Sequence, residues 1–286
     1  MSSDDIKDPL FKIGTEAIAK GDMDALQELL TKYPKLVHQQ LDEPTEGYFK
    51  YPYLLWFVAD NPIRIGKLPP NIAEIAKYII KASKYEKVMD LKHIVNYGMA
   101  LVVSGRIPSE SGVQKELIDV FLDAGASPDH IIGALTHGRI DAAEILLKKG
   151  AKMTLPMAVA TDRFKEAEKF LSKASSNDKQ VALTVASFYG KPEMIQLILN
   201  AGADPNIISA GGFHQHATPL HQAIWSGSIE SVQLLLDAGA RLDIKDKIFG
   251  STPLGWAQYS LSGDDMDDAK REKYSKIEKL LIGGEL

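Results

Sequence analysis

One stretch, residues 217–243, limits what this chain can fold into more than any other: ATPLHQAIWSGSIESVQLLLDAGARLD. Thr218 can cap a helix, and Pro219 fits the first helical position, where its missing N–H would be unpaired anyway. Gly227 and Gly239 supply the left-handed residues that end helices. The stretch therefore predicts two short helices, one on either side of Gly227. Helices this short cannot bury their apolar faces alone and need copies of themselves on both sides.

The stretch carries the pattern T-P-L-H-x-A, then G, then V-x-x-L-L-x-x-G-A. The pattern occupies Thr218, Pro219, Leu220, His221, Ala223, Gly227, Val232, Leu235, Leu236, Gly239 and Ala240. It resembles the ankyrin repeat. The resemblance implies an all-α solenoid of stacked helix-turn-helix repeats. In such repeats the imidazole at the His221 position typically bridges the threonine of its own repeat and backbone groups of the next, which gives a buried polar ring its partners.

Further copies of the pattern, more divergent, occupy the rest of the chain. We predict about seven to eight repeats in a single array, with Asp162 in the glycine position of a degenerate one. The array divides into a loose N-terminus, divergent repeats with insertions, and more regular repeats with a C-terminal cap, at residues 1–8, 9–128 and 129–286. The segment 59–126 also resembles a group of bacterial ankyrin-repeat proteins with no assigned activity.

The connections between the predicted helices differ in length. Insertions at residues 62–70 and 106–112 lengthen the turns of two early repeats. Short intervals between later helices mean that most connecting hairpins are trimmed. We therefore expect short β-hairpin fingers mainly near residues 203–217 and 241–251.

Composition excludes several classes of function. The net charge of −5 is the wrong sign for a protein that coats phosphate backbones, so we expect no nucleic-acid partner. The chain has no cysteine, and therefore no disulfide, thiolate nucleophile or Cys-ligated zinc. Its first residues lack the basic and apolar regions of a secretory signal, and its apolar runs are too short to span a membrane. We predict a cytoplasmic monomer that has no membrane partner.

Candidate chemical groups are few. His214 and His216, at i and i+2 on an extended segment, would point to one side and could begin a metal site, but the sequence places no third ligand. The acidic run from Gly263 to Asp268 lacks the spacing of a calcium-binding EF-hand loop and predicts a solvated loop. None of the common nucleophile, phosphate-binding or zinc-protease motifs is present. We predict no metal, no cofactor and no enzymatic activity.

Large aromatic residues give the sharper signal. In ankyrin arrays the residues just before the glycine of the first helix face the concave groove. The candidate partner-binding residues are these groove positions and the adjacent finger tips: Phe188, Tyr189, Phe213, Trp225, Phe249 and Tyr259. A stacking core does not need large aromatics there, and exposed aromatics are typical of interface hot spots. The alternative is that the fingers fold down and bury the rings among themselves.

A second aromatic cluster has apolar surroundings that favour a core role. It comprises Tyr48, Phe49, Tyr51, Tyr53 and Trp56. The function we predict is protein–protein interaction through the concave groove. A competing hypothesis is an enzyme or small-ligand protein that uses this second cluster and the two insertions as a pocket wall. A deep pocket lined by convergent His, Asp or Arg would favour that alternative. Under a third hypothesis, the protein is a bacterial effector or regulator that acts on a host protein. It would bind that protein by the same kind of contact as in the first hypothesis, so the sequence does not distinguish the two.

Overall fold

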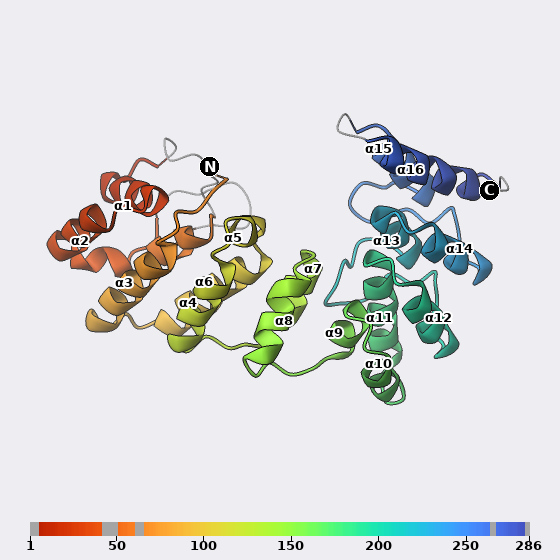
Figure 1. Ribbon diagram of the computed structural model, residues 1–286, viewed down its shortest axis with the longest axis horizontal. Helices are drawn as coiled ribbons and strands as arrows, with labels where there is room; N and C mark the ends of the chain where they lie inside the picture. The colour runs from red at the N-terminus through yellow and green to blue at the C-terminus, as the bar shows by residue number, and fades with distance from the viewer. Residues whose placement is uncertain (1–5, 42–50, 61–65, 264–266, 284–286) are drawn as a thin grey trace. The chain divides into compact units, whose positions relative to one another are not determined.

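The computed structural model describes residues 6–41, 51–60, 66–263 and 267–283. These residues are mostly helical and form no sheet, in agreement with the all-α solenoid that the sequence predicts. The chain folds into two compact units, residues 1–152 and 153–286, which we call the N-terminal and C-terminal units (Figure 1). In the described part, the helices pair into eight repeats.

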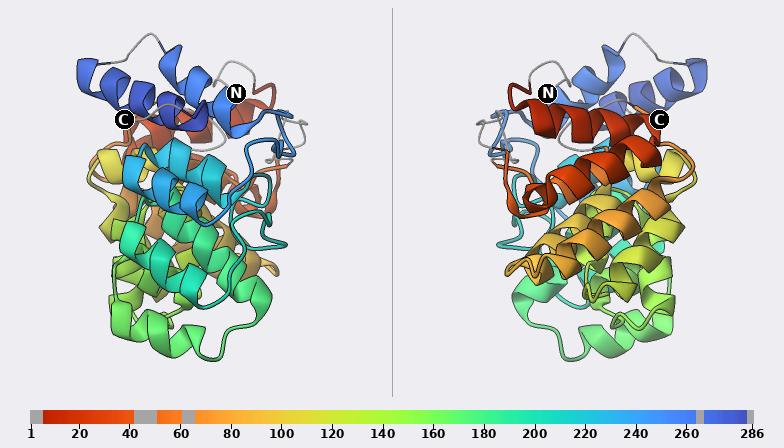
Figure 2. Two further views of the ribbon diagram at one scale, coloured as in Figure 1. Left: turned by 90° about the vertical axis from the view of Figure 1, so that its right-hand side faces the viewer. Right: turned by 90° about the vertical axis from the view of Figure 1, so that its left-hand side faces the viewer.

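Four helix pairs form the N-terminal unit. The first helices of the pairs form one row in which each contacts the next, and the second helices form another, in which a short 3-10 helix contacts both of the first two members (Figure 2, right). The elements are α1 (Pro9–Lys20), α2 (Met23–Lys32), η2 (Pro34–His38), η3 (Leu54–Ala59), α3 (Ile72–Tyr85), α4 (Leu91–Ser104), α5 (Arg106–Glu110), α6 (Gln114–Asp123), α7 (Ile131–Thr136) and α8 (Ile140–Lys148).

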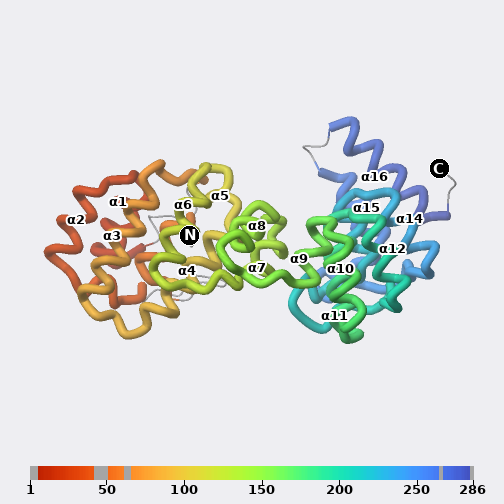
Figure 3. The backbone as a smooth tube through the Cα atoms, turned by 60° about the horizontal axis from the view of Figure 1, so that its bottom comes forward, coloured from red at the N-terminus to blue at the C-terminus, as the bar shows by residue number. Residues whose placement is uncertain are grey.

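The C-terminal unit contains the other four pairs. Helix α13 packs between α11 and α15, and α14 packs between α12 and α16 (Figure 2, left). Figure 3 follows the same helices along the backbone. The helices are α9 (Leu155–Ala160), α10 (Phe164–Leu171), α11 (Ser176–Phe188), α12 (Pro192–Asn200), α13 (Pro219–Ser226), α14 (Ile229–Asp237), α15 (Pro253–Leu261) and α16 (Asp268–Leu281).

Helix boundaries follow the capping residues. Pro219 starts α13 directly after Thr218, and Gly227 ends it in the left-handed conformation, with φ 70°. Gly239 is also left-handed, with φ 86°, and Asp162 adopts φ 54° in its glycine position. Aspartate tolerates this conformation better than most residues because its short side chain can hydrogen-bond locally. The degenerate repeat therefore keeps the regular turn.

The structure describes part of the N-terminal region in which loose residues and insertions are predicted. Residues 1–5 lie outside the described residues, but Ile6 is buried and the Asp8 carboxylate accepts hydrogen bonds from two N–H groups of α1. The loose stretch therefore does not extend over residues 6–8. Of the insertions, residues 106–112 supply α5, and Ser111 Oγ accepts a hydrogen bond of 3.0 Å from the N–H of Leu68.

The predicted β-hairpin geometry of the fingers is wrong. Both connections exist, but neither 203–217 nor 241–251 contains a strand. One backbone hydrogen bond joins them, from the Lys247 N–H to the His216 carbonyl at 2.7 Å. Side chains, described below, hold these loops in place of paired strands.

Candidate functional site

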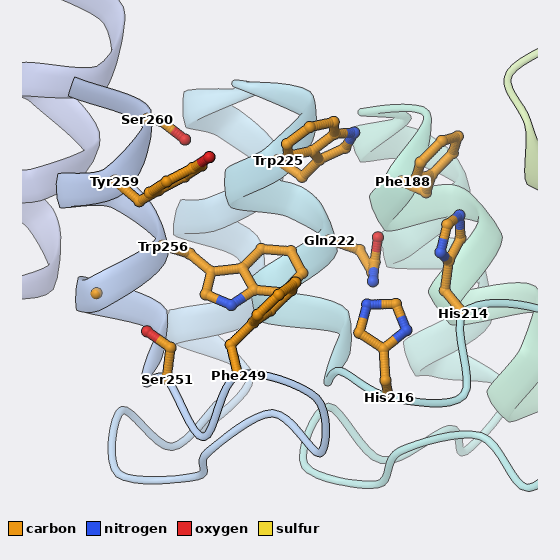
Figure 4. Close-up of a pocket in the computed structure, with 11 residues that line it drawn as sticks. Phe188, His214, His216, Gln222, Trp225, Phe249, Ser251, Trp256, Tyr259 and Ser260 are labelled. Atoms are coloured by element: carbon orange, nitrogen blue, oxygen red, sulfur yellow. The ribbon is translucent and has the colours of Figure 1, made fainter. Parts of the chain in front are cut away.

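An aromatic pocket lies in the C-terminal unit, with a cavity volume of about 520 Å³ (Figure 4). Its walls come from three helices and two loops, and none of the lining residues is Asp, Glu, Lys or Arg. The lining residues are Phe188, His214, His216, Gln222, Trp225, Phe249, Ser251, Gly255, Trp256, Tyr259 and Ser260.

The repeat register places the helical walls. Gln222 and Trp225 lie three residues apart on α13 and so share a face of the helix. Trp256 and Tyr259 occupy the same two positions on α15, 34 residues further along the chain. Because α13 packs directly against α15, these equivalent positions meet at one surface. Phe188, at the end of α11, extends this surface on the other side of α13.

The first finger closes one end of the pocket. The ring of His214 stacks on Phe188, with centroids 4.6 Å apart, and His216 stacks on Trp256 at 6.0 Å. Phe213 lies beneath them in a T-shaped contact of 5.4 Å with Phe188 and is only 1% exposed. The finger therefore folds onto the helices instead of projecting from them.

A buried carboxylate holds the second finger. Asp246 Oδ1 accepts hydrogen bonds from the N–H groups of Ile248 and Phe249 at 2.8 and 2.7 Å. Its Oδ2 accepts from the Ser251 N–H at 2.9 Å and from Trp256 Nε1 at 3.1 Å. Burial alone would raise the pKa of Asp246, but these four donors outweigh it and hold the pKa at about 2. Asp246 thus fixes the Trp256 ring in the pocket wall and the backbone that carries Phe249.

His221 performs the bridging role that the sequence predicts. Its Nδ1 accepts a hydrogen bond from the Thr218 hydroxyl at 2.7 Å, and the Thr218 N–H points to the same atom at 3.3 Å. Its Nε2 lies 3.1 Å from the Ser251 carbonyl, in the neighbouring repeat. This network assigns the ring hydrogen to Nε2, which donates to Ser251. Burial lowers the pKa of His221, so the ring is neutral at pH 7.

Gln222 contributes a buried amide group to the pocket wall. It is 1% exposed, and in the part of the chain that the structure describes its amide nitrogen has no hydrogen-bond partner. In Figure 4 its amide points into the hollow between the rings of Trp225 and His216. Buried amides almost always have partners, so this one needs an explanation.

The predicted partner-binding residues divide by exposure. Trp225 is 55% exposed, and Phe249 and Tyr259 are each 75% exposed at the pocket rim. Phe188 is half-buried in the wall, and Tyr189 packs against it without lining the pocket. The prediction that Phe213 is a surface contact is wrong, because the folded-down finger buries its ring.

The two histidines gain no third metal ligand from the residues that the structure describes. Among the described residues, no group of three or more His, Cys, Asp or Glu side chains could hold a metal ion. His214 and His216 instead lie in the aromatic wall, with ring centroids 5.7 Å apart. Residues 264–266 of the acidic run lie outside the described residues.

Of the described members of the second aromatic cluster, Trp56 belongs to the core. Trp56 is buried, donates from Nε1 to the Ile94 carbonyl at 3.0 Å, and packs on Tyr97 with centroids 4.3 Å apart. Tyr53 makes a T-shaped contact with the same ring at 5.2 Å, whereas Tyr51 is exposed. Tyr48 and Phe49 lie outside the described residues. Because its ring is packed on several sides, Trp56 is not a pocket wall.

Sequence reasoning missed Gln222, Trp256 and Asp246 as members of the site. For the first two a signal existed, since both fill the variable position directly before the alanine of T-P-L-x-x-A. That position lies three residues before Trp225 and Tyr259, on the same helical face. Asp246 carried no such signal, because its role depends on the path of the finger.

Comparison with known proteins agrees with this geometry. Residues 132–246 match the family model for ankyrin repeats, in three copies. The chain contains ankyrin repeats. Repeats of related sequence occur in the phosphate system positive regulatory protein PHO81 of Saccharomyces cerevisiae, 36% identical over 106 residues, which is 37% of this chain and 9% of that protein.

Two further proteins are similar to part of the chain. The human transient receptor potential cation channel subfamily A member 1 is 28% identical over 143 residues, 47% of this chain and 11% of the channel. The bovine inactive serine/threonine-protein kinase TEX14 is 36% identical over 78 residues, 27% of this chain and 5% of that protein. The ankyrin-repeat chain thus spans about a tenth or less of each relative. Within the described ranges, no helix is long and apolar enough to cross a membrane.

Proposed function

We propose that this chain is a non-enzymatic binding module that holds a protein partner in the groove formed by residues of about 185–260. The observation that carries the proposal is the aromatic pocket with its exposed rim of Trp225, Phe249 and Tyr259. Ankyrin repeats generally mediate protein–protein interaction. A preformed stack of repeats also loses little conformational entropy when it binds.

The pocket lining gives little support to the enzyme hypothesis. It offers two histidines but no carboxylate, lysine or arginine for acid–base work. The three relatives are, by their names, a regulatory protein, a channel and an inactive kinase, so a shared repeat segment does not point to one activity. We also propose that the protein is a cytoplasmic monomer. The hypothesis of a bacterial effector or regulator that acts on a host protein stays a prediction, and it concerns only which partner is bound.

The test is affinity capture from the source lysate with wild type and the double variant Trp225→Ala/Tyr259→Ala. The matched control is Tyr85→Ala/Met89→Ala, which removes two exposed apolar side chains from the N-terminal unit. Circular dichroism first establishes that both variants are folded. We expect a partner that wild type and control capture and that the groove variant loses. A partner retained by the groove variant would overturn the proposal.

A further inference from the structure

The amide nitrogen of Gln222 is a buried polar group of the pocket wall that has no hydrogen-bond partner among the described residues. An uncompensated buried amide destabilises a fold, and an apolar residue of similar length would fit the same position without that cost. Its neighbours in the pocket wall are mainly rings, and no residue within the described part accepts a hydrogen bond from its nitrogen. Among the described residues this amide nitrogen therefore has no partner, which is what a site that binds another molecule would contain.

The charge of the lining limits what can enter. None of the lining residues is acidic or basic other than histidine, and burial lowers the pKa of His216, which keeps that ring neutral at pH 7. The carboxylate of Asp246, which holds the Trp256 ring in the pocket wall, already accepts four hydrogen bonds. A charged group enclosed in the pocket would lose its water shell without gaining a counterion, which is strongly unfavourable. The faces of the aromatic rings would attract a cation, but by less than the loss of its water shell costs. The occupant is therefore neutral.

Volume and exposure identify the kind of occupant. About 520 Å³ is in the range of pockets that hold a sizeable organic group. A free small molecule wholly inside would still leave the outer faces of Phe249 and Tyr259, each 75% exposed, in water. A longer segment that passes over the rim would cover them as well. A glutamine amide presents an NH₂ donor group and a carbonyl acceptor side by side, which can pair with the C=O and N–H of a peptide group in such a segment.

We propose that the pocket binds one aromatic or large aliphatic side chain of an extended partner segment, and that the Gln222 amide hydrogen-bonds the peptide group beside that side chain. This inference rests on the proposed function and deepens it. Trp225 and Trp256 form the walls around the anchor, while Phe249 and Tyr259 cover the flanking residues.

The test titrates the full-length protein with capped amino acids and follows the indole N–H signals by NMR. Trp225 and Trp256 report on the pocket, and Trp56, buried in the N-terminal unit, is the internal control. We expect the N-acetyl amides of tryptophan and leucine to shift the two pocket signals but not Trp56. The N-acetyl amides of lysine and glutamate should bind at least about tenfold more weakly, because their charges would be buried unpaired.

The variant Gln222→Met separates the hydrogen bond from the apolar contact. It should weaken binding of the tryptophan amide by roughly three- to tenfold, the effect of one net hydrogen bond. Binding of 3-methylindole, which has the ring but no peptide group, should not change. The melting temperature of the variant shows that it is folded. An unchanged affinity for the amide, or equal binding of the lysine amide, would overturn the inference.

The two proposals fail in different ways. If a groove-dependent partner is captured but neither apolar amide shifts the pocket signals, the pocket inference is overturned and the proposed function stands. If the amides bind as expected but no partner depends on Trp225 and Tyr259, the proposed function is overturned, and with it the assignment of the occupant to a partner segment.

Discussion

At the scale of single residues, Gln222 lowers the stability of the free protein at a position where we propose that a partner binds. Its side chain is buried without a partner for its amide nitrogen, so the free protein is less stable than it would be with an apolar residue there. Local violations of this kind are typical of functional positions, where another interaction offsets them. The same position of the next repeat is filled by Trp256, whose indole N–H is paired with Asp246.

We therefore expect Gln222→Met to raise the free energy of unfolding by about 1 kcal/mol, since it removes an unpaired buried amide and keeps a similar volume. Urea denaturation followed by circular dichroism measures the change. The control is Gln233→Met, on the exposed side of α14, where the amide donates to Asp237 at 2.7 Å. That variant should stay within about 0.5 kcal/mol of wild type. A destabilised Gln222→Met would show that the amide has a structural role.

Four histidines with lowered pKa values give the protein a pH-dependent stability. His221 is fully buried and the other three are partly desolvated, which lowers the pKa of His130, His137, His216 and His221 in the folded state. The unfolded chain, with histidine pKa values of about 6.5, binds protons more readily. The histidines therefore contribute their full stability above about pH 6.5. The free energy of unfolding falls as the pH drops from there toward the lower pKa values of the folded state.

Urea midpoints at pH 7.5 and pH 5.5 measure this loss, and few carboxylates titrate in that window. We expect a lower midpoint at pH 5.5. In His221→Gln, which removes one of the titrating rings, the drop between the two pH values should be smaller. An equal drop would mean that His221 does not contribute.

At the scale of elements, two glycines inside helices respond to substitution in opposite ways. A Cβ on Gly98 of α4 would clash with Cε1 of Phe121, a buried ring of α6. A Cβ on Gly133 of α7 would meet nothing within 4 Å. The first glycine lets two helices approach closely, whereas the second has no packing role in the described structure.

Alanine at the two positions tests this difference. Gly133→Ala should stabilise by about 0.5–1 kcal/mol, because alanine loses less backbone entropy in a helix. Gly98→Ala should destabilise by roughly 1–3 kcal/mol in spite of the same gain, because the methyl group overpacks the core. Thermal unfolding of the two variants and of wild type shows whether each substitution stabilises or destabilises the protein. Stabilisation by Gly98→Ala would show that Phe121 moves aside freely.

The helices could be predicted from the sequence because local residues determine them. Proline, threonine and glycine mark the ends of α13, and the spacing of its repeat places Trp225 and Tyr259 on one surface. The fingers could not be predicted in the same way. Their path depends on the burial of Phe213 and on the Asp246 carboxylate, which are tertiary contacts that leave no periodic signal. The unpaired state of Gln222 is likewise visible only when its neighbours are known.

At the scale of the whole molecule, the prediction of a single array over residues 1–286 stays a prediction. The ankyrin-repeat match spans residues 132–246 and so includes helices of both compact units. In a solenoid, stability is shared between nearest neighbours. If the chain is one array, a change in one unit should therefore alter the stability of the other.

Gly98→Ala in the N-terminal unit provides the test. Urea unfolding followed through the indole signals of Trp56 on one side and of Trp225 and Trp256 on the other reports each unit separately. For one cooperative array we expect the variant to lower the midpoint for all three tryptophans. A shift confined to Trp56 would mean that the two units unfold independently. For one cooperative array, the control Gly133→Ala should raise the urea midpoints of all three tryptophan signals, because it stabilises one of the repeats.

The way Asp246 secures its finger has a consequence for self-association. Paired strands would leave unsatisfied N–H and C=O groups along an outer strand, where another chain can add itself and start aggregation. Here the N–H groups of Ile248, Phe249 and Ser251 converge on one carboxylate instead. This finger can thus present the exposed ring of Phe249 without offering a template for intermolecular β-sheet growth.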